Sequence, residues 1–410
     1  MRRILRGNTL RVAIPCRGAD GWIAGEIYLR NVIQCLAALP PANRPAVRIV
    51  GDLEANTQFV RDMQRLELVE LEPLRAWCRR SRLIETLYHT TNRVLSRALG
   101  PDHRLELWGV DLMYPSLQVQ SGATRQVYWI PDFQHLRLPA MFSAAEREER
   151  TQRQRAIADA RGWLILSSED ALRDFREFFP GASVSPRVWR FRSVVSERDR
   201  GDPDLHSARG VPQKYLYIAN QFWAHKDHLT AFQALRRLKA DGLSIPCVCT
   251  GQEDDYRNRD HMQTLKRYLR EHGLTDQVYF LGLVPRSDQL EIFRHAAGVL
   301  QPSRFEGWST VVEDARALGC SILMSDIEVH KEQAPPAGRY FKVGDDEDLA
   351  RALSAWWPTL PPGPNRSAEE QAHRESQRLQ REAGEALLAI LSEAAGRRPY
   401  PTTDEAPREV

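Results

Sequence analysis

Residues 301–319 read QPSRFEGWSTVVEDARALG and join a short apolar, strand-like run to a helical pattern over residues 313–318. Free backbone N–H groups at the start of a helix attract anions, and the helix dipole adds to this attraction. Gly307 lets the backbone approach a phosphate closely, and Ser309 or Thr310 can cap the helix. The stretch therefore predicts an anion-binding corner between a strand and a helix. An ordinary loop with capping residues is the alternative that the local chemistry leaves open.

Glu306 stands just before this corner. A carboxylate does not suit a phosphate, because like charges repel each other. It suits sugar hydroxyls, since each hydroxyl can donate a hydrogen bond to it. The corner is thus suited to a molecule that carries both phosphate and sugar.

The same stretch resembles the E-x7-E segment of family-4 retaining glycosyltransferases, whose typical run is P-S-x-x-E-G-F-G-x-P-x-x-E-A-x-x-x-G. The matching positions here are Pro302, Ser303, Glu306, Gly307, Trp308, Ser309, Asp314, Ala315 and Gly319. The resemblance implies that Glu306 contacts the donor sugar. It also implies that the backbone of Gly307, Trp308, Ser309 and Thr310 holds the sugar and the diphosphate.

The second acidic position of the segment falls at Asp314, where the family grips the ribose hydroxyls. Asp replaces the family's Glu at this position and is one methylene shorter. Glu313 is adjacent and is the alternative ribose ligand. The two side chains cannot point the same way, because a helix turns by about 100° per residue.

Strand-like runs and helical patterns alternate on both sides of the corner, which predicts βαβ units and parallel sheets in an α/β protein. Strands are expected at residues 10–15, 47–50, 109–114, 126–130 and 162–167, and again at 215–219, 246–250, 278–281, 298–301 and 321–325. Helices are expected at residues 26–39, 83–99, 144–160, 228–241, 260–272, 287–296, 313–318, 346–356 and 368–395. The resemblance implies the GT-B fold, in which two Rossmann-like, doubly wound domains face a cleft.

The polar stretch over residues 196–212 contains Gly and Pro and indicates an interdomain linker. It divides the chain into an acceptor-binding domain and a domain that binds a nucleotide sugar. The expected parts are residues 1–195, the linker, residues 213–357, a helical segment over 358–396 that can return to the first domain, and a disordered tail over 397–410.

The loop over residues 217–228, YIANQFWAHKDH, follows an expected strand and contains Lys226. A Lys at this place is a common counter-charge for phosphate. The loop resembles a subgroup of the same family that carries N-Q-F-W-x-H-K, and Lys226 matches the family's diphosphate-binding Lys. Asn220 and Gln221 then fall in the donor site, with Gln221 where the family usually has Arg. His225 or His228 can compensate for the missing charge, or both are solvated loop residues.

The first half of the chain contains further candidate site residues, which are supported by fewer matching positions. Residues 127–142, VYWIPDFQHLRLPAMF, follow an expected strand. Many relatives have His-Asp there, and in this chain Asp132 matches the Asp while His135 is the candidate for the missing His. A packed loop capped by Asp132 is the alternative. The glycine loop over residues 18–28 resembles the family's early glycine loop, in which Gly25 leads a helix towards the diphosphate. Gly251 and Leu281 lie at strand ends where the family binds the base.

Composition narrows the classes of function. A net charge of +3 over 410 residues argues against a nucleic-acid partner. The six cysteines lack metal-ligand spacing and indicate reduced thiols in a cytoplasmic protein. No apolar run approaches the ~18 residues of a membrane span. Arginines 75, 79, 80 and 82 with Trp77 form either a solvated face or a peripheral contact with a membrane.

The expected activity is the transfer of a sugar, with retention, from a nucleotide diphosphate sugar to a hydroxyl of a glycan or lipid-linked glycan, in bacterial polysaccharide or glycan synthesis. The resemblance implies that no cofactor and no metal take part. The acidic pairs 254–255 and 345–346 are interpreted as structural on the same ground. A nucleotide-sugar epimerase of this fold and a non-catalytic nucleotide-sugar-binding protein are the alternatives.

Overall fold

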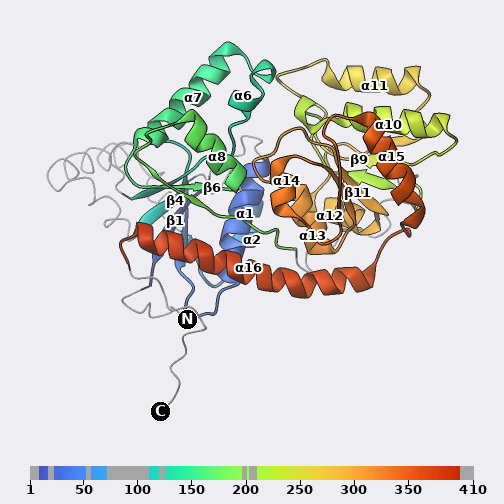
Figure 1. Cartoon of the computed structure of the whole chain (residues 1–410). Helices are drawn as coiled ribbons and strands as arrows, with labels where there is room; N and C mark the ends of the chain where they lie inside the picture. Colours follow the sequence, from blue (N-terminus) through green and yellow to red (C-terminus); the bar gives the residue numbers. More distant parts are fainter. Residues whose placement is uncertain are drawn as a thin grey trace. The chain divides into compact units, whose positions relative to one another are not determined.

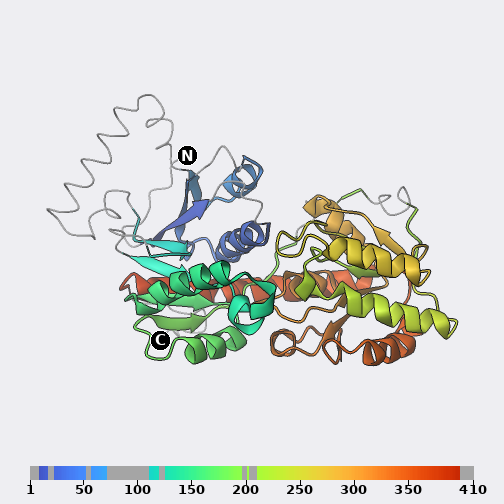
Figure 2. The same cartoon turned by 90° about the horizontal axis from the view of Figure 1, so that it is seen from above.

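The computed structural model describes residues 9–16, 23–51, 57–71, 110–119, 125–195, 201–202 and 210–397. The chain divides into two compact units (Figures 1 and 2). The first unit comprises Met1–Pro131, Glu148–Arg192 and Leu379–Val410. The second comprises Asp132–Arg147 and Ser193–Arg378. The predicted division at residues 196–212 did not separate Asp132–Arg147 from the first half, whereas in the structure this segment packs with the second unit.

The first unit is built on a parallel sheet in the order β3-β2-β1-β4-β5-β6-β7. Its strands are β1 (Arg11–Cys16), β2 (Ala46–Gly51), β3 (Val69–Leu71), β4 (Leu112–Ser116), β5 (Gln126–Trp129), β6 (Trp163–Leu166) and β7 (Ser185–Val188). The helices between them are α1 (Ile23–Ala37), α2 (Thr57–Gln64), α7 (Ala144–Asp159) and α8 (Glu169–Phe178).

The second unit repeats this strand order over a sheet of six strands, β10-β9-β8-β11-β12-β13, which is also parallel. The strands are β8 (Leu216–Ile218), β9 (Cys247–Cys249), β10 (Val278–Phe280), β11 (Gly298–Gln301), β12 (Ile322–Ser325) and β13 (Gly338–Phe341). The helices are α6 (Gln134–Arg137), α10 (His228–Ala240), α11 (His261–Glu271), α12 (Arg286–His295), α13 (Thr310–Leu318), α14 (Glu328–Gln333) and α15 (Asp346–Trp356).

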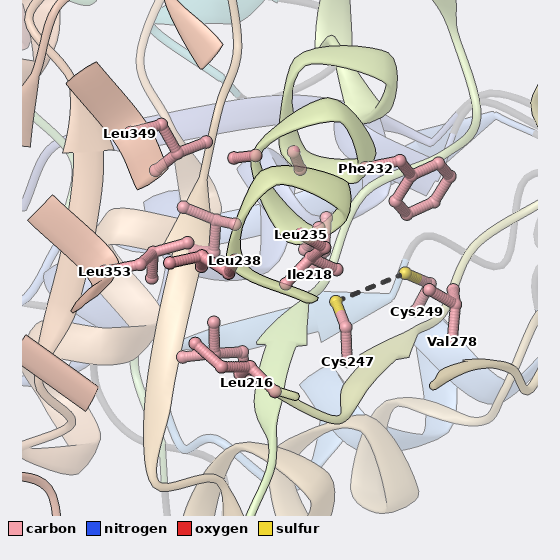
Figure 3. Packing of buried hydrophobic residues seen from close by; sticks show 14 of the residues in the cluster. Leu216, Ile218, Phe232, Leu235, Leu238, Cys247, Cys249, Val278, Leu349 and Leu353 are labelled. Atoms are coloured by element: carbon pink, nitrogen blue, oxygen red, sulfur yellow. Dashed lines mark hydrogen bonds between the residues drawn. The ribbon is translucent and has the colours of Figure 1, made fainter. Parts of the chain in front are cut away.

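Helices cover both faces of the second sheet, because successive side chains of a buried strand point to opposite faces. On one face, Leu216 and Ile218 of β8 pack with α10, α11 and α15. Figure 3 shows Leu235, Leu238, Leu349 and Leu353 of this cluster around the strand. On the other face, Tyr215 and Tyr217 pack with side chains of α12 and α13. The strand sequences are therefore mostly apolar throughout, as expected for a parallel sheet that is buried on both faces.

Cys247 and Cys249 point to the same face of β9, and their Sγ atoms lie 3.9 Å apart (Figure 3). Both thiols are unoxidised and buried. Burial raises the pKa of the Cys249 thiol well above its usual value. Both cysteines act as apolar core residues, which agrees with the interpretation of their alternation as a strand pattern.

The long helix α16 (Arg366–Ala394), red in Figures 1 and 2, contributes to each unit. Its residues up to Arg378 belong to the second unit, and those from Leu379 belong to the first. In the first unit, the indole of Trp189 donates to the carbonyl of Ala383 at 2.8 Å. In the second, Glu369 pairs with the buried Arg294 at 2.7 Å.

Several elements were not predicted, among them the ten-residue helix α8 and the shorter α6, β7, α14 and β13. Short elements carry too few residues for a clear period and are stabilised by tertiary packing. Helix α1 begins at Ile23 rather than at Glu26, so Gly25 lies inside the helix and does not precede it. The helix predicted over residues 83–99 and the arginine cluster over 75–82 lie outside the described residues. No helix in the described ranges is long and apolar enough to span a membrane.

Candidate functional site

The candidate site lies where the connections of the second sheet change direction. Strands β8 and β11 are neighbours, but the chain runs from β8 outward to β10 before it returns to β11. In open parallel sheets, ligands bind beyond the carboxyl ends of two such strands, because the following loops diverge there. The loops that leave β8 and β11 contain Lys226 and Glu306, the two residues on which the sequence prediction depends.

Lys226 and Glu306 form an ion pair. Lys226 ends the 3-10 turn η3 (Ala224–Lys226), and its Nζ donates to Oε1 of Glu306 at 2.6 Å. The side chains are only 16% and 9% exposed, respectively. A pair so sheltered from water interacts more strongly than a surface pair. The structure thus brings together the predicted phosphate ligand and the predicted sugar ligand.

Gln301, the last residue of β11, connects this pair to the end of β8. Its Oε1 accepts from the side-chain amide of Asn220 at 2.7 Å. Its Nε2 donates to Oε1 of Glu306 at 2.9 Å and lies 3.1 Å from the hydroxyls of Ser303 and Ser309. Gln301 is completely buried, so these bonds hold the Glu306 carboxylate in one place. Sequence reasoning missed this residue, because a Gln at a strand end has no distinctive pattern.

A second ion pair ties the same two loops together. The guanidinium of Arg304 donates to the carboxylate of Asp227 at 2.8 Å, and the backbone N–H of Arg304 donates to the carbonyl of His225 at 2.8 Å. Asp227 has a left-handed backbone with φ of 52°, which turns the chain from η3 into α10. Residues before and after Lys226 are therefore held against the loop that carries Glu306.

Helix α13 begins at Thr310, directly after this network. Ser309 is its N-cap residue, but its side chain makes no capping bond, which corrects that part of the prediction. The Ser309 hydroxyl lies instead against Gln301, and its backbone N–H donates to Oε1 of Gln333 at 3.2 Å. Trp308 is nearly buried. Gly307, Trp308, Ser309 and Thr310 thus occupy the N-terminus of a nine-residue helix beside Glu306.

The structure separates the two acids of α13. The carboxylate of Asp314 accepts hydrogen bonds from both Nη atoms of Arg286, at 2.5 and 2.7 Å. Arg286 is the first residue of α12, which follows β10. Glu313 accepts instead from Gln333 of α14 at 3.1 Å. Asp314 therefore faces the β10 side of the sheet, where the predicted base-binding residues lie. Glu313 faces the opposite side.

Gly251 and Leu281 follow β9 and β10, and they belong to the same edge of the sheet. Leu281 donates its backbone N–H to Cys249, and Gly251 donates to Gly282. Gly251 has φ of 143°, and a Cβ there would clash with the backbone of Asn220 and Gln221. Only glycine fits at this point. Gly251 supports the start of the Lys226 loop through this close approach.

Buried histidines surround the Lys226 loop. His330 of α14 is completely buried, and its Nδ1 donates to the carbonyl of Ser325 at 2.9 Å. Burial lowers the pKa of His330 to about 4, and the nearby Glu306 partly opposes this. Burial likewise lowers the pKa of His228 to about 3 and that of His225 well below its usual value. The lowered pKa values favour the neutral form of all three rings at pH 7, and compensation by His225 or His228 for Gln221 stays a prediction.

The segment Asp132–Arg147 is held to the second unit by Arg257. This guanidinium lies over the rings of Phe142 and Trp223, at 5.1 and 4.8 Å from their centroids. It also donates to Gln134 at 3.2 Å and to the buried Asp255 at 3.2 Å. Such stacking of a guanidinium on aromatic faces is favourable where water is excluded.

His135 and Asp132 have different positions in this segment. His135 is completely buried in α6, with its ring edge-on to Phe142 at 6.3 Å. Asp132 accepts from the backbone N–H of Gln134 at 2.9 Å, just before α6, whose N-cap residue is Phe133. Gly25 lies in the other unit, within α1. Its role and that of His135 stay predictions.

The acidic pairs have structural partners. Asp255 binds Arg257, Asp345 caps α15 through the N–H of Asp348, and Asp346 pairs with Arg237. Over the described ranges, no group of three or more His, Cys, Asp or Glu side chains is arranged to hold a metal ion.

Residues 206–358 match the family model described as Glycosyl transferases group 1. The second unit carries a group 1 glycosyltransferase domain. The matched range contains Asn220, Lys226, Gln301, Glu306 and Asp314, so the whole network described above lies inside the glycosyltransferase domain. No curated protein matches the chain by sequence.

Solved structures show how far the likeness of this glycosyltransferase extends. Anabaena HepE in complex with UDP and glucose has a TM-score of 0.59 at 14% identity, over 94% of this chain and 98% of that one. A glycosyltransferase from Rickettsia africae has a TM-score of 0.59 at 11% identity, over 94% and 99%. Sucrose-phosphate synthase from Thermosynechococcus elongatus has a TM-score of 0.58 at 15% identity, over 94% and 98%. The likeness covers both units and confirms the predicted GT-B fold.

Proposed function

We propose that the protein is a family-4 retaining glycosyltransferase that moves a sugar from a nucleotide diphosphate sugar to a hydroxyl acceptor. The observation that carries this proposal is the Lys226–Glu306 pair, which joins a cation and a carboxylate at the switch point of the sheet. The family model over residues 206–358 supports it, and so does the complex of HepE with UDP and glucose.

Lys226 and the N-terminus of α13 supply the positive charge that the reaction needs. When the glycosidic bond breaks, negative charge builds up on the diphosphate that leaves. An ammonium and a helix dipole that are already in place stabilise this charge without reorganising water. They take the part that a bound metal ion plays in other transferases, so we propose that no metal or other cofactor is required.

Glu306 binds hydroxyls of the transferred sugar, and Asp314 binds the ribose. Both hydrogen bonds that the described residues make to the Glu306 side chain end on Oε1, which leaves Oε2 for a hydroxyl. Each oxygen of Asp314 accepts one hydrogen bond from Arg286, and a carboxylate has further lone pairs with which to accept from the ribose hydroxyls. Retention of configuration fits a departing phosphate that accepts the proton of the acceptor hydroxyl.

We propose a glycan or a lipid-linked glycan as the acceptor, in bacterial polysaccharide synthesis at the cytoplasmic side of the membrane. These finer assignments rest on the resemblance of the E-x7-E segment. The first unit would supply the acceptor surface, with Gly25 near the diphosphate.

A thermal-shift screen tests the donor. UDP-glucose, GDP-glucose, ADP-glucose and dTDP-glucose are each added to the chain, with and without EDTA. At a concentration of 100 times Kd, a ligand stabilises the folded state by about 2.7 kcal/mol. We expect one nucleotide class to raise the melting temperature, with no effect of EDTA. No shift with any of the four would contradict the proposal, and a shift that EDTA removes would point to a metal.

A further inference from the structure

We infer that the Lys226–Glu306 pair is a latch that makes the site prefer an intact nucleotide sugar over the nucleoside diphosphate that remains after transfer. This inference rests on the proposed function and adds to it a means of releasing the product. It follows from the partners that the two side chains have in the structure.

Glu306 is the ion-pair partner that the described residues offer to Lys226, at 2.6 Å. Any phosphate that binds Lys226 therefore has to share the ammonium with this carboxylate or displace it. Glu306 cannot turn away freely, because Gln301 donates to the same oxygen at 2.9 Å and is itself fixed by Asn220. The carboxylate therefore stays near the bound phosphate, whether the phosphate shares the ammonium or displaces Glu306 from it.

The nucleoside diphosphate and the nucleotide sugar differ in the charge and the hydrogen-bond donors that they place next to Glu306. A nucleoside diphosphate ends in a free terminal phosphate with about two negative charges at pH 7, and this phosphate has no sugar hydroxyl attached that could donate to a carboxylate. Its terminal phosphate is repelled by Glu306, in a place where the carboxylate is only 9% exposed and little screened. A nucleotide sugar carries one charge less at this phosphate, and its hydroxyls can donate to Oε2.

Glu306 therefore adds a favourable interaction for the donor and an unfavourable one for the product. Specificity commonly arises from such a repulsive element combined with an attractive one. After transfer the sugar leaves, the hydroxyl bonds to Glu306 disappear, and the repulsion remains. Lys226 then returns to Glu306 as the diphosphate departs.

Calorimetric titration of three proteins tests the latch: the wild type, Glu306→Gln and Glu271→Gln. The variant at Glu306 keeps the shape of the side chain and the acceptor for Gln301 but removes the charge. Glu271 is the control, since it is an acid of the same unit that pairs with Arg267 at the end of α11 and has no part in the site. The ligands are the nucleoside diphosphate and the corresponding glucose conjugate of the base that the thermal-shift screen selects. Melting temperatures show that each variant is folded.

We expect the wild type and Glu271→Gln to bind the glucose conjugate at least about 10-fold more tightly than the diphosphate, a difference of about 1.4 kcal/mol. In Glu306→Gln the diphosphate should bind about 10-fold more tightly than it does to the wild type, and the preference should vanish. Unchanged or weaker binding of the diphosphate to Glu306→Gln would overturn the latch. An equal gain for both ligands would also overturn it, because it would show a general effect of charge. If neither ligand binds the wild type, the proposed function itself is wrong.

Discussion

The two sheets have the same strand order around their first four strands, yet the places where their connections reverse differ in chemistry. In the second unit, Lys226, Gln301 and Glu306 form a polar network beyond β8 and β11. In the first unit, Tyr28 of α1 stacks on Trp129 of β5, with centroids 3.6 Å apart, and its hydroxyl bonds to that of Tyr114 in β4. Two sheets with one strand order can therefore carry different side-chain chemistry among their described residues.

The largest effect should come from breaking the polar network. Lys226→Ala should lower kcat/KM for sugar transfer by about 10³, the loss typical of removing one preorganised charge-stabilising group. The melting temperature should stay close to that of the wild type, because the substitution removes a group needed for the reaction and not one needed for folding. Lys239→Ala is a matched control, since Lys239 is an exposed Lys of α10 that pairs with Asp276. Wild-type turnover in Lys226→Ala would remove Lys226 from the site.

Removing the stack of Tyr28 on Trp129 should lower the stability of the fold and leave nucleotide binding unchanged. Trp129→Ala removes the ring that stacks on Tyr28 and is only 5% exposed. The expected loss is about 3–5 kcal/mol of unfolding free energy, as for other buried Trp truncations. Differential scanning calorimetry measures the loss, and titration with the selected nucleotide sugar should show nearly unchanged affinity. A Trp129→Ala variant that is as stable as the wild type but no longer binds nucleotide would contradict this assignment of Trp129 to folding.

Acid should destabilise the second unit through its buried histidines, His225, His228 and His330. His330 has its pKa lowered to about 4, so its neutral form stabilises the fold fully above its unfolded pKa of about 6.5. This contribution is lost as pH falls from 6.5 towards 4, and it amounts to about 3 kcal/mol at most. Denaturant titrations from pH 7.5 to 4.5 measure the loss, and a flat stability profile would contradict the assignment.

The smallest effect should come from the second ion pair. Arg304→Ala removes the link to Asp227 without touching Lys226 or Glu306. We expect kcat/KM to fall about 10-fold, because the Lys226 loop becomes less well positioned. Arg304→Lys should restore part of the loss. Equal activity of wild type and Arg304→Ala would show that the backbone bond from Arg304 to His225 suffices.

The sequence predicted more of the second unit than of the first, because its strands and helices are regular and its motifs are close to the strand ends. The proximity of Lys226 and Glu306 was predictable, since both follow strands of one parallel sheet. The partners that fix them were not. Gln301 became visible only through its bonds to Asn220 and Glu306, and Arg286 lies 28 residues from Asp314. Such contacts depend on how helices pack, which no local pattern encodes.

Asp132–Arg147 shows the same limit. Its sequence follows a strand of the first sheet, and its position in the chain assigned it to the first half. Its packing depends on Arg257, more than 100 residues away, which binds Gln134 and covers Phe142. The contacts of this buried guanidinium link the segment to the second unit, and no pattern in the sequence announces them.

The most direct test is a crystal structure of the chain with the nucleoside diphosphate glucose that the thermal-shift screen selects. Our account predicts that the diphosphate contacts Nζ of Lys226 and the N-terminus of α13, while a glucose hydroxyl donates to Glu306. A nucleotide bound elsewhere, with Lys226 and Glu306 still paired at 2.6 Å, would contradict it.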